Sequence, residues 1–123
     1  MDFVRLVYLH KCNYNNGVPQ VRFEWDEAKN LSNQRKHGVS FEEASRVFFD
    51  PLHIVVGDRV VDGEQRWLAL GLIRRDAGSF LLLIVAHTVH EDEETGDLVE
   101  IFRIISARRA VSEERRVYEV ENG

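Results

Sequence analysis

Four apolar stretches follow one another between Pro51 and Arg109, and they constrain the fold more than any other feature of the sequence. Each stretch is bounded by glycine, aspartate or charged residues, which are the residue types that end strands and form turns. Consecutive strands with short connections usually pair side by side in opposite directions. The sequence therefore predicts a four-stranded antiparallel sheet, formed by the segments LHIVVGD, RWLALGLIR, SFLLLIVAHT and VEIFRIISA.

Two helices are predicted before these strands and one after them. Asp26 is in position to cap the first helix, and Gly38 is in position to end it. Ser40 and Glu43 have the spacing of a capping box, and apolar residues recur at helical intervals after them. Ser112 is in position to cap the last helix. This order predicts an α+β domain with two N-terminal helices, a four-stranded antiparallel sheet and a C-terminal helix.

Length and composition favour one compact domain with its own core, because the chain has 123 residues and is 44% hydrophobic. Residues 1–20 show no sustained periodicity, so we expect an N-terminal extension of doubtful order and a domain over residues 21–123. The single cysteine, Cys12, excludes an internal disulfide and is typical of a reducing compartment. The apolar runs are too short to cross a bilayer and the N-terminus lacks a signal-peptide layout, so we expect a cytoplasmic protein without a membrane partner.

The net charge of −5 argues against a nucleic-acid ligand, but its distribution weakens that objection. The segment EDEETGDLVE at positions 91–100 holds six acidic residues and no lysine or arginine, which leaves 15 acidic against 16 basic residues elsewhere. We interpret this segment as a solvated turn between two strands. The remainder of the chain is slightly basic.

Arg103 stands among isoleucines in the last predicted strand. A lone buried guanidinium is very costly, so Arg103 must either lie on a solvated, functional face of the sheet or pair with a carboxylate such as Glu64. Side chains alternate between the two faces of a strand. Strict alternation places Ile101, Arg103, Ile105 and Ala107 on one face, and Phe102, Ile104, Ser106 and Arg108 on the other.

Three blocks of the sequence, in the same order and spread over residues 23–119, resemble the BrnT family of bacterial toxins. They are FEWDEAKNLSNQRKHGVSFEEASRVFFD, GEQRWLALG and RIISARRAVSEERRVYE. The resemblance implies a ribonuclease toxin of a type II toxin-antitoxin system, with a RelE-like fold and no cofactor. It also implies a BrnA-type antitoxin in a 2:2 complex, with DNA contacted only through the antitoxin. His90 stands where many relatives have an arginine.

Metal-free RNA cleavage needs a base for the 2′-hydroxyl proton, cations that hold the phosphate and an acid for the leaving oxygen. Residue types alone leave the acid and the base open. The predicted catalytic residues are Lys36, His37, Glu64, Arg66, Arg103, Ser106 and Arg108. The predicted RNA-binding residues are Lys29, His87, Thr88 and His90, and the predicted antitoxin contacts are Arg116 and Tyr118.

Several of these residues have a purely structural alternative. Lys36 and His37 precede the glycine that ends a predicted helix, where cations interact with the last helical carbonyls. His87 and His90 invite comparison with a zinc site, but residues three apart in a strand point to opposite faces, and we predict no metal.

The alternative class is a non-enzymatic nucleic-acid-binding or protein-interaction module, in which the two closely spaced helices form a helix-turn-helix. The second helix carries Glu42 and Glu43 and has Arg46 as its single basic residue. That composition does not suit the major groove of DNA.

Overall fold

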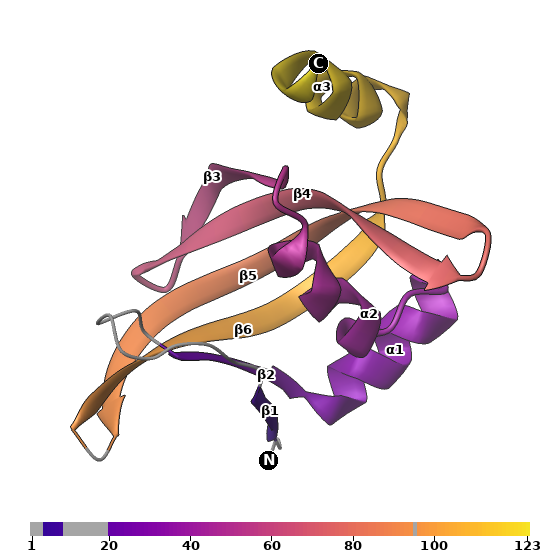
Figure 1. The fold of residues 1–123 in the computed structure, drawn as a ribbon. Helices are drawn as coiled ribbons and strands as arrows, with labels where there is room; N and C mark the ends of the chain where they lie inside the picture. Colours follow the sequence, from indigo (N-terminus) through magenta and orange to yellow (C-terminus); the bar gives the residue numbers. More distant parts are fainter. Residues whose placement is uncertain (1–3, 9–19, 95) are drawn as a thin grey trace.

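A mixed sheet with the strand order β1-β2-β6-β5-β4-β3 forms the centre of the domain (Figure 1). The computed structural model describes residues 4–8, 20–94 and 96–123. The elements, in chain order, are β1 (Val4–Tyr8), β2 (Gln20–Asp26), α1 (Glu27–His37), α2 (Phe41–Ser45), the 3₁₀ helix η2 (Arg46–Phe49), β3 (Ile54–Val61), β4 (Glu64–Asp76), β5 (Ser79–Glu94), β6 (Asp97–Arg109) and α3 (Ser112–Asn122). None of the helices in this described part of the chain is long and apolar enough to cross a membrane.

The predicted antiparallel arrangement of β3, β4, β5 and β6 is confirmed. The prediction of a purely antiparallel, four-stranded sheet is wrong, because β2 adds to β6 as a parallel strand and β1 pairs antiparallel with β2. Parallel neighbours need a long crossover, and here the crossover comprises α1, α2 and the other three strands of the meander. Part of the predicted N-terminal extension is thus a strand of the sheet, and residues 9–19 lie outside the described residues.

The helix boundaries set by short-range signals are confirmed. The Asp26 carboxylate accepts a hydrogen bond from the backbone N–H of Ala28 at 2.9 Å, and Gly38 ends α1 with a φ of 69°. Ser40 and Glu43 form the predicted capping box. The helix that follows is short, because α2 gives way to η2 after five residues. A helix of that length offers no recognition helix for the major groove.

Two other predictions need correction. Ser112 is the first residue of α3 and not its cap, because the cap position belongs to Val111, whose backbone N–H donates to the Glu114 carboxylate at 2.9 Å. The acidic segment at positions 91–100 is not simply a turn, since β5 continues to Glu94 and β6 begins at Asp97. Most of its residues extend the β5–β6 hairpin.

One face of the sheet packs against α1, α2 and η2 and forms the main core. This core contains the fully buried Phe23 and Trp25 of β2, Phe41 of α2 and Val85 of β5. We call the opposite face of the sheet the outer face. There, Leu70, Leu82 and Ile84 form a second, smaller cluster with Tyr118 of α3 packed against it, and Figure 1 shows α3 well apart from α1 and α2.

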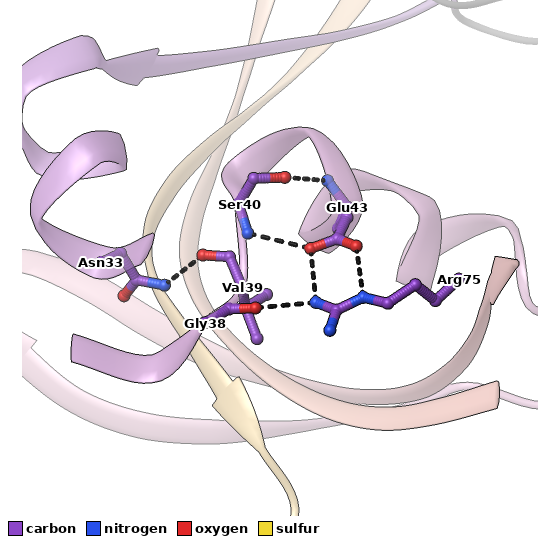
Figure 2. A network of polar contacts seen from close by, with 6 residues as sticks. All are labelled: Asn33, Gly38, Val39, Ser40, Glu43 and Arg75. Atoms are coloured by element: carbon purple, nitrogen blue, oxygen red, sulfur yellow. Dashed lines mark hydrogen bonds and ion pairs between the residues drawn. The ribbon is translucent and has the colours of Figure 1, made fainter. Parts of the chain in front are cut away.

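Arg75, close to the end of β4, connects the sheet to the junction between α1 and α2 through hydrogen bonds (Figure 2). Its guanidinium donates to both carboxylate oxygens of Glu43, at 2.8 and 2.9 Å, and to the backbone oxygen of Gly38 at 2.7 Å. Asn33 of α1 adds a second connection, because its side chain donates to the backbone oxygens of Val39 and Ala107. The carboxylate of Glu43 therefore caps α2 and also accepts the hydrogen bonds from Arg75 of β4.

A bulge in β6 changes which of its side chains share a face. Ser106 pairs with Ala86 and Ile104 pairs with His87, so Ile105 is an extra residue without a partner of its own in β5. The strict alternation expected from the sequence is therefore wrong beyond Ile104. With one residue skipped, Ala107 joins Ile104 in the main core, as its burial shows.

Candidate functional site

The bulge brings three predicted catalytic residues of β6 onto the outer face. Arg103 precedes the extra residue, and Ser106 and Arg108 follow it. Arg108 pairs with Ile84, which belongs to the outer-face cluster, so the pairing confirms the face on which Arg108 lies. Strict alternation would have separated Arg103 from the other two.

A row of polar residues crosses this face over three neighbouring strands. Arg103 in β6 is directly opposite Glu24 in β2 on one side and Thr88 in β5 on the other. Neighbouring strands lie about 4.8 Å apart, so the three side chains form a continuous row. Arg66 continues this polar surface in β4, since it alternates with Trp67, the partner of His87, and so lies on the outer face.

Arg103 forms an ion pair with Glu24, in which Nη1 lies 3.3 Å from Oε2. The sequence predicted a carboxylate such as Glu64 as the alternative partner, and the structure supplies Glu24 because β2 is the parallel neighbour of β6. The side chain of Arg103 is 37% exposed and that of Glu24 is 19% exposed. The guanidinium is thus held by a half-buried carboxylate and remains open to solvent.

Thr88 lies beneath this surface, with 2% of the residue exposed. Within the described residues, its Oγ1 is a buried side-chain oxygen without a hydrogen-bond partner. Buried hydroxyl groups almost always have a partner, so such an atom next to Arg103 in the sheet is unusual. Thr88 was predicted to bind RNA, and its burial limits it to contacts made under the arginines.

Arg108 has its own carboxylate partner in α3. Its Nη1 and Nη2 donate to the two carboxylate oxygens of Glu114, each at 2.9 Å, while the side chain stays 41% exposed. The hydrogen bonds from Arg108 lower the pKa of the Glu114 carboxyl, although burial opposes them. A bidentate guanidinium of this kind also matches the oxygens of a phosphate. Ser106 is exposed between Arg103 and Arg108.

The two histidines of β5 lie on opposite faces, as their spacing predicts. His87 is 1% exposed and packs edge-on to Phe48 and Phe102 in the main core. Burial lowers its pKa, and its Nδ1 lies 3.2 Å from the backbone oxygen of Val85. His87 is therefore a buried core residue on the face opposite to Arg103. His90 is exposed, two residues beyond Thr88.

The histidines do not converge on a metal. In the part of the chain that the structure describes, no three residues of the types His, Cys, Asp and Glu lie close enough together to hold an ion.

The structure does not bring the predicted residues of α1 to this face. Lys29, Lys36 and His37 are exposed on a helix that packs against the other side of the sheet, and Lys36 and His37 form part of its basic last turn. Cations in that position interact favourably with the helix dipole. Glu64 is exposed at the start of β4, two strands away from Arg103 in the sheet order.

The two predicted antitoxin contacts lie on α3 but differ in their surroundings. Arg116 is exposed. Tyr118 is half-buried, and its hydroxyl donates to the Asp50 carboxylate at 2.6 Å. In the free chain the helix therefore packs on its own sheet, and the hydroxyl of Tyr118 is already engaged.

Glu24 is the residue at this face that sequence reasoning missed. It stands within FEWD, where Phe23 and Trp25 are fully buried and Glu24 alternates with them. That alternation is the signal of a short strand, and it could have placed Glu24 on the opposite face. Its partner, 79 residues further along the chain, could not have been found from the sequence pattern.

A mixed sheet with α1, α2 and η2 on one face, and with α3 and partly exposed arginines on the other, defines a small α+β domain. The chain belongs to the family of the ribonuclease toxin BrnT of type II toxin-antitoxin systems, which matches it over residues 25–114. The match contains Arg66, Thr88, Arg103, Ser106 and Arg108, and it begins one residue after Glu24. A search of the curated proteins gave no match. Membership of this family implies an RNA substrate and an antitoxin partner.

Proposed function

We propose that this chain is a metal-independent endoribonuclease that cleaves RNA on the outer face of its sheet and thereby arrests growth. The observation that carries the proposal is the bulge of β6, which gathers Arg103, Ser106 and Arg108 on one face with Arg66 nearby. Guanidinium groups form bidentate hydrogen bonds with phosphate and stabilise the negative charge that develops on it during cleavage. A ribonuclease toxin acts where its RNA is, so we expect it to work in the cytoplasm.

The remaining predicted residues have more limited roles in this proposal. The hydroxyl of Ser106 is placed to donate to a phosphate oxygen, and the exposed imidazole of His90 to contact RNA beside Thr88. Lys29, Lys36 and His37 lie on the other side of the sheet, so any contact they make is with parts of the RNA that extend past the sheet edge.

The test is RNA cleavage by the purified Arg103→Ala and Arg108→Ala variants. Each change is expected to lower the rate by on the order of a hundredfold, because a donor to the transition state is lost. Arg35→Ala is the matched control, since Arg35 is an exposed cation in the last turn of α1. Expression of the wild type, but not of Arg103→Ala, should arrest growth. Loss of cleavage together with the melting transition would show that Arg103 serves the fold instead.

The proposed inhibitor is a BrnA-type antitoxin that covers Arg66, Arg103 and Arg108 with acidic residues of its own. Complementary charges favour such an interface. At the rim, α3 presents Arg116 and two exposed valines, Val117 (50%) and Val120 (72%). If the antitoxin is a dimer with a DNA-binding half, the assembly contains two toxins and two antitoxins, and DNA is contacted through the antitoxin.

Co-expression tests this interface. Light scattering of the purified complex should give a mass near that of two toxins and two antitoxins, with RNA cleavage suppressed and then restored on separation. A complex that forms and still cleaves RNA at the full rate would show that the inhibitor does not cover the outer face.

A further inference from the structure

We infer that Glu24 is the general base that takes the proton of the attacking ribose 2′-hydroxyl. The inference rests on the proposed function and adds to it a residue for the proton transfer. The family match begins at residue 25 and so does not include Glu24. It follows from the place of Glu24 in the polar row of the outer face and from the single contact of its carboxylate among the described residues, the ion pair with Arg103.

Three other carboxylates of the described residues near the outer face, those of Glu114, Asp50 and Glu64, are poorly suited to this role. Glu114 is tied to Arg108 through both oxygens and also accepts the backbone N–H of Val111. Asp50 accepts three hydrogen bonds, from Tyr118 and from two backbone N–H groups. A carboxylate stabilised in this way is a weak base. Glu64 is exposed and stands two strands away from Arg103.

Glu24 differs from these three in having one long contact. Its Oε2 accepts from Arg103 at 3.3 Å, and within the described residues its Oε1 has no hydrogen-bond partner. The side chain is 19% exposed, so one oxygen can meet a ligand that lies on the sheet. It is thus a half-buried carboxylate with an unused acceptor beside a cation.

The position of Arg103 explains how a phosphate is brought to this base. A guanidinium has five N–H donors, and the ion pair with Glu24 uses a single one, which leaves the others for phosphate oxygens. The 2′-hydroxyl that attacks a phosphate in RNA is on the ribose directly attached to it. A phosphate held by Arg103 therefore carries its own 2′-hydroxyl to within reach of the neighbouring carboxylate.

Thr88 supports this arrangement from the other side of Arg103. Its buried Oγ1 has no hydrogen-bond partner among the described residues, and Thr88 is directly opposite Arg103. When a bound phosphate moves the guanidinium of Arg103 away from Glu24, the Oγ1 of Thr88 can accept a hydrogen bond from that guanidinium. The move frees the carboxylate for the proton and satisfies a buried hydroxyl group.

The step balances as an internal transesterification. The 2′-hydroxyl proton passes to a Glu24 carboxylate oxygen, and the 2′ oxygen forms a bond to phosphorus. The bond between phosphorus and the 5′ oxygen breaks, and the leaving oxygen takes a proton from water. The products are a 2′,3′-cyclic phosphate and a 5′-hydroxyl end, and the hydroxide left from that water recovers the proton from Glu24.

The experiment compares Glu24→Gln and Glu24→Ala with wild type, using the full chain and a mixed-sequence RNA oligonucleotide pool. Glutamine keeps a neutral acceptor for Arg103 but cannot take a proton. Both variants are expected to lose cleavage by on the order of a hundredfold, and formate should partly restore Glu24→Ala by entering the vacated space. Glu119→Gln, an exposed change on α3, is the matched control and should cleave at the wild-type rate.

The outcomes separate this inference from the proposed function. Cleavage by Glu24→Gln within roughly threefold of wild type overturns the role of Glu24 while the ribonuclease assignment stands, because a true base contributes far more. A wild-type chain that cleaves no RNA overturns the proposed function itself.

A further measurement decides the matter if Glu24→Gln loses its melting transition. Glu24→Asp keeps the charge of the ion pair and a proton acceptor, withdrawn by one methylene, so it should stay folded and cleave RNA more slowly than wild type. A folded Glu24→Asp that cleaves at the wild-type rate overturns the assignment.

Discussion

Tyr118 donates a hydrogen bond of 2.6 Å to the carboxylate of Asp50, and this contact joins α3 to the end of η2. The same carboxylate accepts the backbone N–H groups of Leu52 and Leu72, at 2.9 and 2.8 Å. Burial and the hydrogen bond to Asp50 raise the pKa of Tyr118 to about 12. Asp50 therefore connects three parts of the chain, the 3₁₀ helix, β4 and the C-terminal helix.

Changing Tyr118 to Phe should loosen α3 without unfolding the domain. The variant loses one hydrogen bond to a charged group, so we expect a loss of about 1.5–3 kcal/mol in the free energy of unfolding. Amide hydrogen exchange should accelerate in α3 and stay unchanged in β5. Val117→Ala, an exposed change on the same helix, is the control. Unchanged exchange in α3 of the Tyr118→Phe variant would mean that the Asp50 contact does not hold the helix.

The ion pair between Arg75 and Glu43 should make folding sensitive to acid. Hydrogen bonds from Arg75 lower the pKa of the Glu43 carboxyl below its ordinary value of 4.5. Its contribution to stability is therefore complete above about pH 4.5 and is lost as the pH falls through the lower pKa of the folded state. Urea unfolding between pH 7 and pH 3 measures this. In Arg75→Met the fall in stability on acidification should be smaller, and an equal fall in both proteins would contradict the link.

Gly71 in β4 has no room for a side chain. A Cβ atom there would lie 2.7 Å from Cγ1 of Val47 and 3.1 Å from the backbone oxygen of the same residue. Gly71→Ala should therefore cost about 1–3 kcal/mol by overpacking the contact between the sheet and η2. Gly78→Ala is the control, since a Cβ at that position meets no atom within 4 Å. Equal melting temperatures for the two variants would disprove the close packing.

RNA cleavage should survive excess EDTA, because the proposed site works with arginines and no metal. It should weaken as salt is added, since the cations that bind phosphate are solvent-exposed in part and are screened. Initial rates at several salt concentrations, with and without chelator, provide the measurement. Complete inhibition by EDTA that zinc or manganese reverses would contradict a metal-free mechanism.

Local signals made the helix boundaries and the four-stranded meander predictable from the sequence. Asp26, Gly38 and the Ser40–Glu43 pair act within a few residues of their own positions, so a pattern reveals them. The strand β2 was missed because it has seven residues and ends at Asp26, the residue that also caps α1. The alternation of Phe23, Glu24 and Trp25 covers only a few residues, so the adjacent helix signal outweighed it.

The arrangement of the candidate site could be predicted only in part, because it depends on long-range pairing. Arg103 and Arg108 were proposed from their residue type, but alternation placed them on opposite faces because a bulge depends on the partner strand. His87 is predicted to contact RNA, and its buried position edge-on to Phe48 and Phe102 follows from tertiary packing. The partner of Arg103 required the parallel pairing of β2 with β6.

The parallel pairing of β2 with β6 also has a consequence for synthesis of the protein. Glu24 and Arg103 are separated by 79 positions, so their contact cannot form until β6 has left the ribosome. A nascent chain that ends before β6 contains neither Arg103 nor Arg108 and lacks the central strand of the polar row. Translation must therefore pass β6 before this fold can assemble its arginine surface, and a product truncated before β6 lacks both arginines.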